Sequence, residues 1–252
     1  MRGGQCGPPH HLAPRPIHRH ARPGRYGATI PTMESLAEVR VEALACTRCG
    51  LADGRTQVVF GVGNPGADLL LVGEGPGREE DLRGEPFVGR SGKLLDTLLH
   101  QELGIDRTSC YIANVVKCRP PGNRDPRPDE IDACRPYLDA QVRLIAPRVV
   151  VTLGNFATRT LLGTTDGIRR LRGAAYPFGA AHLVPTYHPA AALRGGAEVV
   201  AEMRADLVRA KALLTGRRSE LPAGVGVLST EAHRNEQLPG ETAAREPAGP
   251  RR

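Results

Sequence analysis

The sequence predicts an α/β fold, in which a central, mainly parallel four-stranded sheet lies between two layers of helices. Two observations carry this prediction. Four short aliphatic runs follow one another along the chain, and stretches with helical periodicity separate them. Strands that alternate with helices are typical of parallel sheets covered on both faces. We therefore expect a single three-layer α/β/α domain at residues 33–215.

The expected strands are short apolar runs bounded by turn residues. They are Asp68–Val72, Tyr111–Val116, Val149–Leu153 and His182–Pro185. In an open parallel sheet, ligands bind beyond the carboxyl ends of the strands. The segments expected at that edge are Gly73–Gly77, Asn114–Cys118, Gly154–Asn155 and Thr186–Pro189.

The expected helices show apolar residues at helical spacing. They cover Leu36–Leu44 after a Ser35 cap, Leu94–Leu99, a stretch from Asp129 to Ile145, Phe156–Leu162 and Val199–Leu214. Pro128 suits a first helical turn, where its missing N–H has no partner to lose. Pro136 lies inside the same stretch and is expected to kink the helix or split it in two.

Both ends of the chain are predicted to be disordered. Residues 1–32 hold five arginines, no acidic residue and no apolar run, which excludes a signal peptide or membrane span there. Met33 is a plausible true start. Residues 216–252 are rich in Pro, Gly, Ala and Glu without periodicity. No other segment reads as a membrane anchor, so a cytoplasmic, nucleoid-associated protein is expected.

The positive charge of the chain lies mainly in its first 32 residues. The formal net charge is +7, of which residues 1–32 carry five units and residues 216–252 one. The middle of the chain is therefore nearly neutral, and any surface for an anionic partner has to be a local patch.

Four of the six cysteines form a candidate metal site. They are Cys46, Cys49, Cys118 and Cys134, the first two in a C-x2-C arrangement. Ordinary buried thiols are the alternative. In a chain without a secretory signal, this pattern favours metal binding over disulfides. A zinc site of four thiolates and a [4Fe–4S] cluster both fit the ligand set, although zinc sites more often use two closely spaced C-x2-C pairs.

The glycine-rich segment Gly73–Gly77 follows the first expected strand. It lacks the residues of a P-loop and of a dinucleotide fingerprint. Its glycines allow a tight turn in which backbone N–H groups approach a ligand, which makes Gly73 and Gly75 candidate binding residues. A turn without function is the alternative.

Three blocks together resemble the family 4, iron–sulfur uracil-DNA glycosylases. The first is Gly73–Gly77 with Glu79–Asp81, Gly84–Arg90 and Gly92, the second Asn114–Arg124, and the third Tyr187–Arg194. The four cysteines fall where that family holds a [4Fe–4S] cluster. The resemblance covers residues 34 to 214 in order and neither tail.

The resemblance implies a uracil pocket. Phe87 would stack on the extruded base with its flat apolar face. Asn114 would read uracil N3–H and O4 with one acceptor and one donor, and Glu80 would crowd the C5 methyl group of thymine. A core phenylalanine and a solvated acidic run are the alternatives for Phe87 and Glu80.

The resemblance also implies the catalytic groups. His188 would donate a hydrogen bond to the departing uracil O2, where negative charge develops, and Glu74 would position or activate the attacking water. An ordinary loop histidine is the alternative for His188. A basic rim for DNA phosphates is expected from Lys117, Arg119, Arg124 and Arg194.

The function expected is that of a monomeric, monofunctional uracil-DNA glycosylase acting on single- or double-stranded uracil-containing DNA. It would release uracil and leave an abasic site for base-excision repair. One alternative is a glycosylase for another deaminated base such as hypoxanthine. The other is a non-catalytic, metal-stapled nucleic-acid-binding module, which would need neither Glu74 nor His188.

Overall fold

The computed structural model describes residues 33–216, and every structural statement below refers to that part of the chain. The disorder expected for residues 1–32 and 217–252 lies outside the described residues. The helices are α1 (Leu36–Leu44), α2 (Arg78–Arg83), α3 (Arg90–Leu98), α4 (Pro128–Ile145), α5 (Asn155–Leu162), α6 (Ile168–Leu171) and α7 (Pro189–Thr215), with short turns η1 (Gly50–Ala52), η2 (Leu99–Leu103) and η3 (Pro121–Asn123).

The strands form one sheet in the order β1-β3-β2-β4-β6-β5. They are β1 (Val62–Gly63), β2 (Leu69–Gly73), β3 (Tyr111–Asn114), β4 (Val149–Leu153), β5 (Tyr176–Phe178) and β6 (Ala181–Thr186). The four inner strands are parallel and correspond to the four expected ones. The sheet has six strands rather than four, because β1 and β5 each pair antiparallel with one edge.

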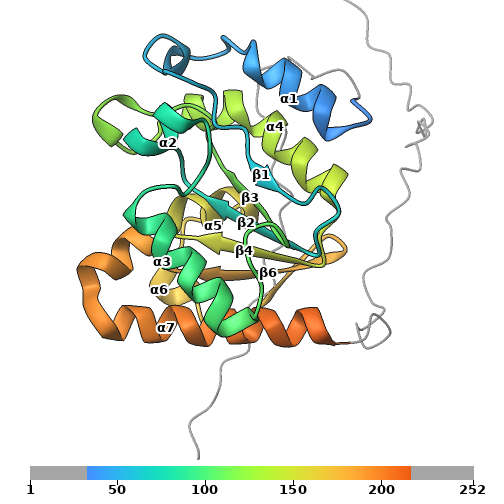
Figure 1. The fold of residues 1–252 in the computed structure, drawn as a ribbon, viewed down its shortest axis with the longest axis vertical. Helices are drawn as coiled ribbons and strands as arrows, with labels where there is room; N and C mark the ends of the chain where they lie inside the picture. The colour runs from blue at the N-terminus through green and yellow to red at the C-terminus, as the bar shows by residue number, and fades with distance from the viewer. Residues whose placement is uncertain (1–32, 217–252) are drawn as a thin grey trace, which may run out of the picture. The chain divides into compact units, whose positions relative to one another are not determined.

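Helices cover both faces of this sheet, as expected for a three-layer fold. Figure 1 shows α1 and α4 on one side and α3 and α7 on the other. Successive residues of a strand point to opposite faces, so Leu70 of β2 packs with the α1 and α4 residues, whereas Leu69 and Leu71 pack with α3 and α7. The two apolar layers hold the sheet between them and fix its strand ends in space.

The register of the sheet brings the functional segments together. Gly73 at the end of β2 lies opposite Asn114 at the end of β3, and Leu153 of β4 lies opposite Thr186 of β6. The next strand in the sequence, β3, lies on one side of β2, and the strand after that, β4, lies on the other side, so the order of the strands reverses at β2. A crevice at such a switch point is where ligands bind in open α/β sheets.

Two helices differ from expectation. α4 is one continuous helix across Pro136, so of the kink or split expected there the split is wrong. α7 starts at Pro189 rather than near residue 199, and its first turns are separated from the rest at Gly196, whose φ of 73° and ψ of −160° are not helical. Proline fits the first turn of both α4 and α7.

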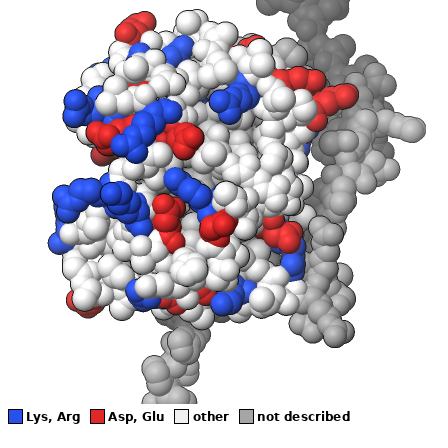
Figure 2. Space-filling model, viewed as in Figure 1, with Lys and Arg blue, Asp and Glu red and all other residues white. Residues whose placement is uncertain are grey.

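The surface in view carries charges of both signs. Figure 2 shows basic and acidic side chains interspersed over this face rather than a basic field, in line with the nearly neutral middle of the sequence. Within residues 33–216, no helix is both long and apolar enough to cross a bilayer.

Candidate active site

A cleft of about 650 Å³ opens at the carboxyl ends of the inner strands. Its walls come from the loop after β2, the turn before α3, the loop after β3 and the segment before α7. The residues expected at the site that line it are Glu74, Gly75, Glu80, Phe87, Asn114, Arg124, His188 and Arg194. Three sequence blocks thus converge on one cavity, which a functional site requires.

Gly73 lies directly behind two residues that line the cleft, Asn114 and Phe87. A Cβ built on this glycine would lie 2.4 Å from Asn114 Oδ1 and 2.5 Å from Phe87 Cζ. Any side chain at position 73 would therefore displace the amide, the ring or both. Gly75 is similarly confined, since its Cβ would lie 2.7 Å from Val116 Cγ2. The glycines of this loop make room for the side chains beside them.

Asn114 carries a buried acceptor with no partner among the described residues. Its side chain is 2 % exposed, and Oδ1 accepts no hydrogen bond. An unpaired buried oxygen costs about 1–3 kcal/mol, so its retention points to a ligand that supplies the missing donor. An imide N–H meets that need.

The aromatic ring of Phe87 lies beside the imidazole of His188. Their centroids are 5.6 Å apart with an interplanar angle of 32°. Phe87 is buried and also lines the cleft. It has a φ of 55°, which is rare for a residue with a side chain.

Burial, together with a smaller effect of the nearby carboxylate of Asp125, raises the pKa of Glu74 to about 7. Glu74 lines the cleft, as does Asp125. A carboxyl group with a pKa near neutrality is suited to exchange protons or orient water at physiological pH.

His188 is held as a neutral imidazole. Burial lowers its pKa to about 4, with the positive charge of Arg194 acting in the same direction and Glu80 opposing it. Nδ1 accepts a hydrogen bond from the N–H of Ala190 at 3.2 Å. Because Nδ1 is an acceptor, the ring proton lies on Nε2, which leaves a fixed N–H donor.

Glu80 binds the backbone of its own loop. One carboxylate oxygen accepts from Gly77 N at 3.1 Å, and the other from Val88 N and Gly89 N at 3.0 Å each. The neighbouring Asp81 is 2 % exposed and accepts from Thr56 N at 2.9 Å. The alternative of a solvated acidic run is therefore wrong for both carboxylates.

The expected basic rim is only partly at the surface. Lys117 is 2 % exposed and donates to Asn114 O at 2.7 Å and Gln141 Oε1 at 2.6 Å, so its assignment to DNA phosphates is wrong. Gln141 on α4 supplies a buried acceptor for its ammonium group.

The three arginines of the expected rim differ in their partners. Arg119 donates to Asn123 Oδ1 at 2.7 Å, and Arg124 forms a two-point ion pair with Glu130 at 2.6 and 2.9 Å. Arg194 is exposed at the edge of the cleft. The charge of Arg124 is therefore already balanced, whereas Arg194 faces the solvent beside His188.

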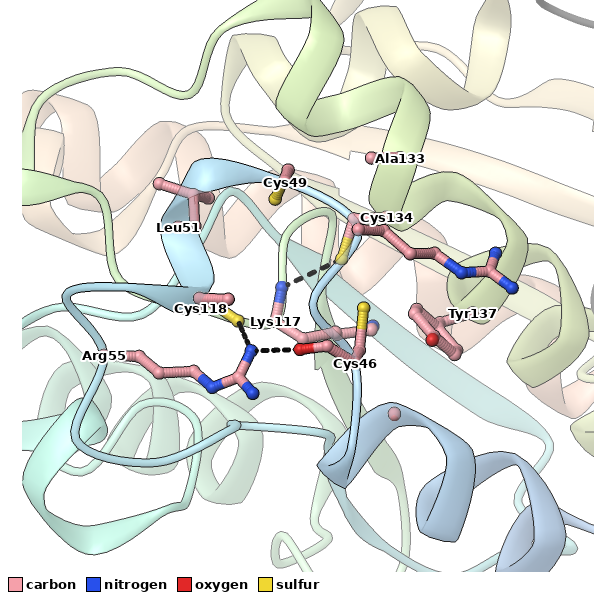
Figure 3. Close-up of a pocket in the computed structure, with 12 residues that line it drawn as sticks. Cys46, Cys49, Leu51, Arg55, Lys117, Cys118, Ala133, Cys134 and Tyr137 are labelled. Atoms are coloured by element: carbon pink, nitrogen blue, oxygen red, sulfur yellow. Dashed lines mark hydrogen bonds between the residues drawn. The ribbon is translucent and has the colours of Figure 1, made fainter. Parts of the chain in front are cut away.

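The four cysteines line one cavity between α1, the loop after β3 and α4. Figure 3 shows the sulfur atoms of Cys46, Cys49, Cys118 and Cys134 around a common space. Within residues 33–216, no three Cys, His, Asp or Glu side chains stand close enough together to hold a single metal ion. A closed zinc site would draw all four sulfurs to about 2.3 Å from one ion.

Two donors point at these sulfurs. Arg55 Nη1 lies 3.3 Å from Cys118 Sγ and also donates to Cys46 O at 2.7 Å, and Lys117 N lies 3.2 Å from Cys134 Sγ. Hydrogen bonds and positive charge stabilise thiolates over thiols. Burial acts in the opposite direction and raises the pKa of Cys49, Cys118 and Cys134, so a positively charged bound group would be needed to hold the cysteines as thiolates.

Sequence reasoning missed several residues of the cleft. Asp125, Ser91 and Phe156 line it, but the sequence patterns gave none of the three a chemical role. Asp125 lies in the Pro-rich loop, and only the folded loop brings its charge near Glu74.

Comparisons with known proteins agree with this geometry. The family model described as Uracil DNA glycosylase superfamily matches residues 60–210. A type-4 uracil-DNA glycosylase of Thermotoga maritima is 47% identical over 166 residues, covering 65% of this chain and 86% of the relative. Those of Sulfurisphaera tokodaii and Archaeoglobus fulgidus are 45% and 44% identical over 169 residues, covering 64% of this chain and 77% and 84% of the relatives.

Proposed function

The chain belongs to the uracil-DNA glycosylase superfamily, and we propose that its cleft binds an extruded uracil and releases it from DNA. The observation that carries the proposal is the unpaired Oδ1 of Asn114, buried at the floor of the cleft beside the ring of Phe87. The uracil in a duplex is out of reach of this floor, so the nucleotide has to be extruded into the cleft.

Base recognition follows from donors and acceptors. Asn114 Oδ1 accepts the uracil N3–H, and the amide of the same side chain donates to O4. Cytosine presents the reverse pattern and would leave these groups unpaired. The base stacks on Phe87, while the loop that Glu80 holds closes the C5 side, where a thymine methyl group would have to fit.

Two side chains then act in hydrolysis, His188 on the departing uracil and Glu74 on the attacking water. As the N-glycosidic bond breaks, positive charge develops on the sugar and negative charge on uracil O2. The Nε2–H of His188 stabilises that oxygen as a neutral donor. Glu74, when ionised, orients the water that attacks the sugar. No lysine of the described residues lines the cleft, so strand cleavage through a Schiff base is not expected.

The four cysteines are proposed to hold a [4Fe–4S] cluster. All four line one cavity, and four cysteine thiolates are the ligand set that such a cluster takes. When bound, the cluster supplies a cross-link between three distant segments. Cys118 lies in the loop that follows β3, and Asn114 is the last residue of β3. Binding through Cys118 and Cys134 would therefore fix the loop directly after Asn114.

The substrate is uracil-containing DNA, taken by a monomer with Arg194 and Arg119 against its phosphates. Hypoxanthine is the second candidate base, because its ring presents a similar amide edge.

The test is single-turnover base release from oligonucleotides with one deoxyuridine, deoxyinosine or thymidine, single-stranded and opposite guanine. Wild-type protein is compared with Glu74→Ala, His188→Ala and Phe87→Ala. We expect uracil release by the wild type and a loss of about 10²-fold or more in His188→Ala. Release of hypoxanthine at the rate of uracil would favour the second candidate. No release of any base, from protein with its iron bound, would refute the enzyme assignment.

A further inference from the structure

Arg107 holds the backbone of the turn that carries Phe87. Its Nη2 donates to Pro86 O at 3.0 Å and to Phe87 O at 3.2 Å. Its Nε lies 3.4 Å from Asp96 Oδ1 on α3, which places the guanidinium between that helix and the turn. Arg107 lies in the loop before β3, outside all three sequence blocks and outside the cleft lining.

The turn needs such a restraint. Phe87 has a φ of 55°, and a conformation of this kind costs about 1–3 kcal/mol unless its surroundings enforce it. The carbonyl of Phe87 also points at Gly92 of α3, where a Cβ would lie only 1.7 Å away. The backbone of Phe87 is thus pressed against α3 in a strained conformation.

Charges of opposite sign hold the two sides of the turn. Arg107 faces its carbonyl oxygens, whereas Glu80 accepts the N–H groups of Val88 and Gly89 that follow Phe87. Hydrogen bonds to ionised groups are about twice as strong as neutral ones. Only the ring of Phe87 extends from this restrained backbone into the cleft.

We propose that Arg107 is a positioning residue for Phe87, and through Phe87 for the extruded uracil. The guanidinium fixes the two carbonyls of the turn so that the ring presents its face to the base. This inference rests on the proposed function, because it requires Phe87 to stack on uracil. Arg107 itself touches neither the base nor the sugar.

The test is a double-mutant cycle between Arg107→Met and Phe87→Ala, with kcat and KM measured on a deoxyuridine oligonucleotide and the Kd of free uracil measured by product inhibition. Misplacement of a reacting group by 1 Å costs up to about 10²-fold, so we expect Arg107→Met to lower kcat/KM by about 10- to 100-fold. In the Phe87→Ala background, the same change should cost less than about threefold, since the ring it positions is gone.

Arg148→Met is the matched control. Arg148 also donates to backbone carbonyls, Leu214 O at 2.7 Å and Gly216 O at 2.6 Å, but it lies outside the cleft lining. It should keep wild-type kcat/KM and uracil affinity. Arg107→Lys keeps the positive charge but not the planar, two-pronged donor group of arginine, so its kcat/KM should lie between those of Arg107→Met and the wild type. If Arg107→Met does not fold, Arg107→Lys takes its place in the cycle.

Three results would overturn the inference. They are wild-type kcat/KM in Arg107→Met, a full loss that persists in the Phe87→Ala background, and an equal loss in Arg148→Met. Failure of the proposed function looks different, because the wild-type protein would then release no uracil at all, and the inference would fall with it.

Discussion

At the scale of single residues, burial sets the protonation states of the two side chains proposed to act on the glycosidic bond. It raises the pKa of Glu74 to about 7 and lowers that of His188 to about 4. Near neutral pH, the imidazole is therefore neutral while the carboxyl group titrates. The two groups differ in the pH range in which each changes its charge.

This difference predicts the pH profile. Glu74 is protonated below its raised pKa, so single-turnover uracil release should rise with pH through about 7 and then level off. His188 should add no inflection between pH 5 and 8, since it is already neutral there. Glu74→Gln should lower the plateau rate and remove the inflection near pH 7. His188→Gln should also lower the plateau rate, but the inflection should remain. An inflection unchanged in Glu74→Gln would contradict the assignment.

Replacement of Asn114 by an apolar residue is expected to preserve or raise stability and to lower activity. Asn114→Leu removes a buried acceptor that has no partner in the described residues, so we expect the melting temperature to stay or rise. The same change removes both hydrogen bonds to uracil and should lower kcat/KM by about 100-fold or more. Differential scanning calorimetry and the release assay measure the two effects. A destabilised variant with normal activity would contradict both expectations.

The sequence predicted which side chains gather at the strand ends, whereas their chemical roles stay predictions. Glu74, Asn114 and His188 meet in one cleft as expected. Lys117 is of a residue type that is mostly exposed, yet it is buried and donates to Gln141, 24 positions away in the sequence. Nothing near Arg107 in the sequence indicates its contact with the Phe87 turn, since that contact exists only after folding.

At the scale of elements, the site is built from strand ends and from the turns packed on them. The four parallel strands were predictable, because a strand covered on both faces is a continuous aliphatic run. The edge strands β1 and β5 were not, since β1 has two residues and β5 contains Pro177, and neither shows a strand pattern. The start of α7 was missed because Gly195 and Gly196 interrupt its periodicity.

The contact between α3 and the Phe87 turn gives a prediction for an element. Gly92→Ala places a methyl group against the Phe87 carbonyl, where the ideal Cβ lies 1.7 Å away. We expect it to lower the free energy of unfolding by about 1–3 kcal/mol, the usual range for overpacking, and to reduce uracil release by moving Phe87. Gly66→Ala is the control, since its Cβ meets only Asn64 Oδ1 at 3.6 Å. Equal behaviour of the two variants in denaturant titrations would contradict the tight contact.

At the scale of the whole molecule, the cysteine cavity joins parts of the chain that are far apart in sequence. Cys46 and Cys49 follow α1, Cys118 lies after β3, and Cys134 is on α4. A group bound to all four closes long loops and should stabilise the native state.

Replacement of one ligand tests this cross-link. Cys118→Ala should lower the iron content and visible absorbance of the purified protein and its melting temperature. Cys110→Ala is the matched control, because Cys110 is also buried but lies outside the cysteine cavity; it should keep its iron. Zinc in place of iron in the wild type, found by elemental analysis, would contradict the cluster.

We expect this chain to hydrolyse the bond between uracil and deoxyribose and to leave the DNA strand intact. The most direct measurement is mass spectrometry of the products formed from an oligonucleotide with a single deoxyuridine. We predict free uracil and one unbroken strand with an abasic site, and no change in the matched thymidine oligonucleotide. A strand broken at the deoxyuridine, or no free uracil from the iron-containing protein, would contradict the account.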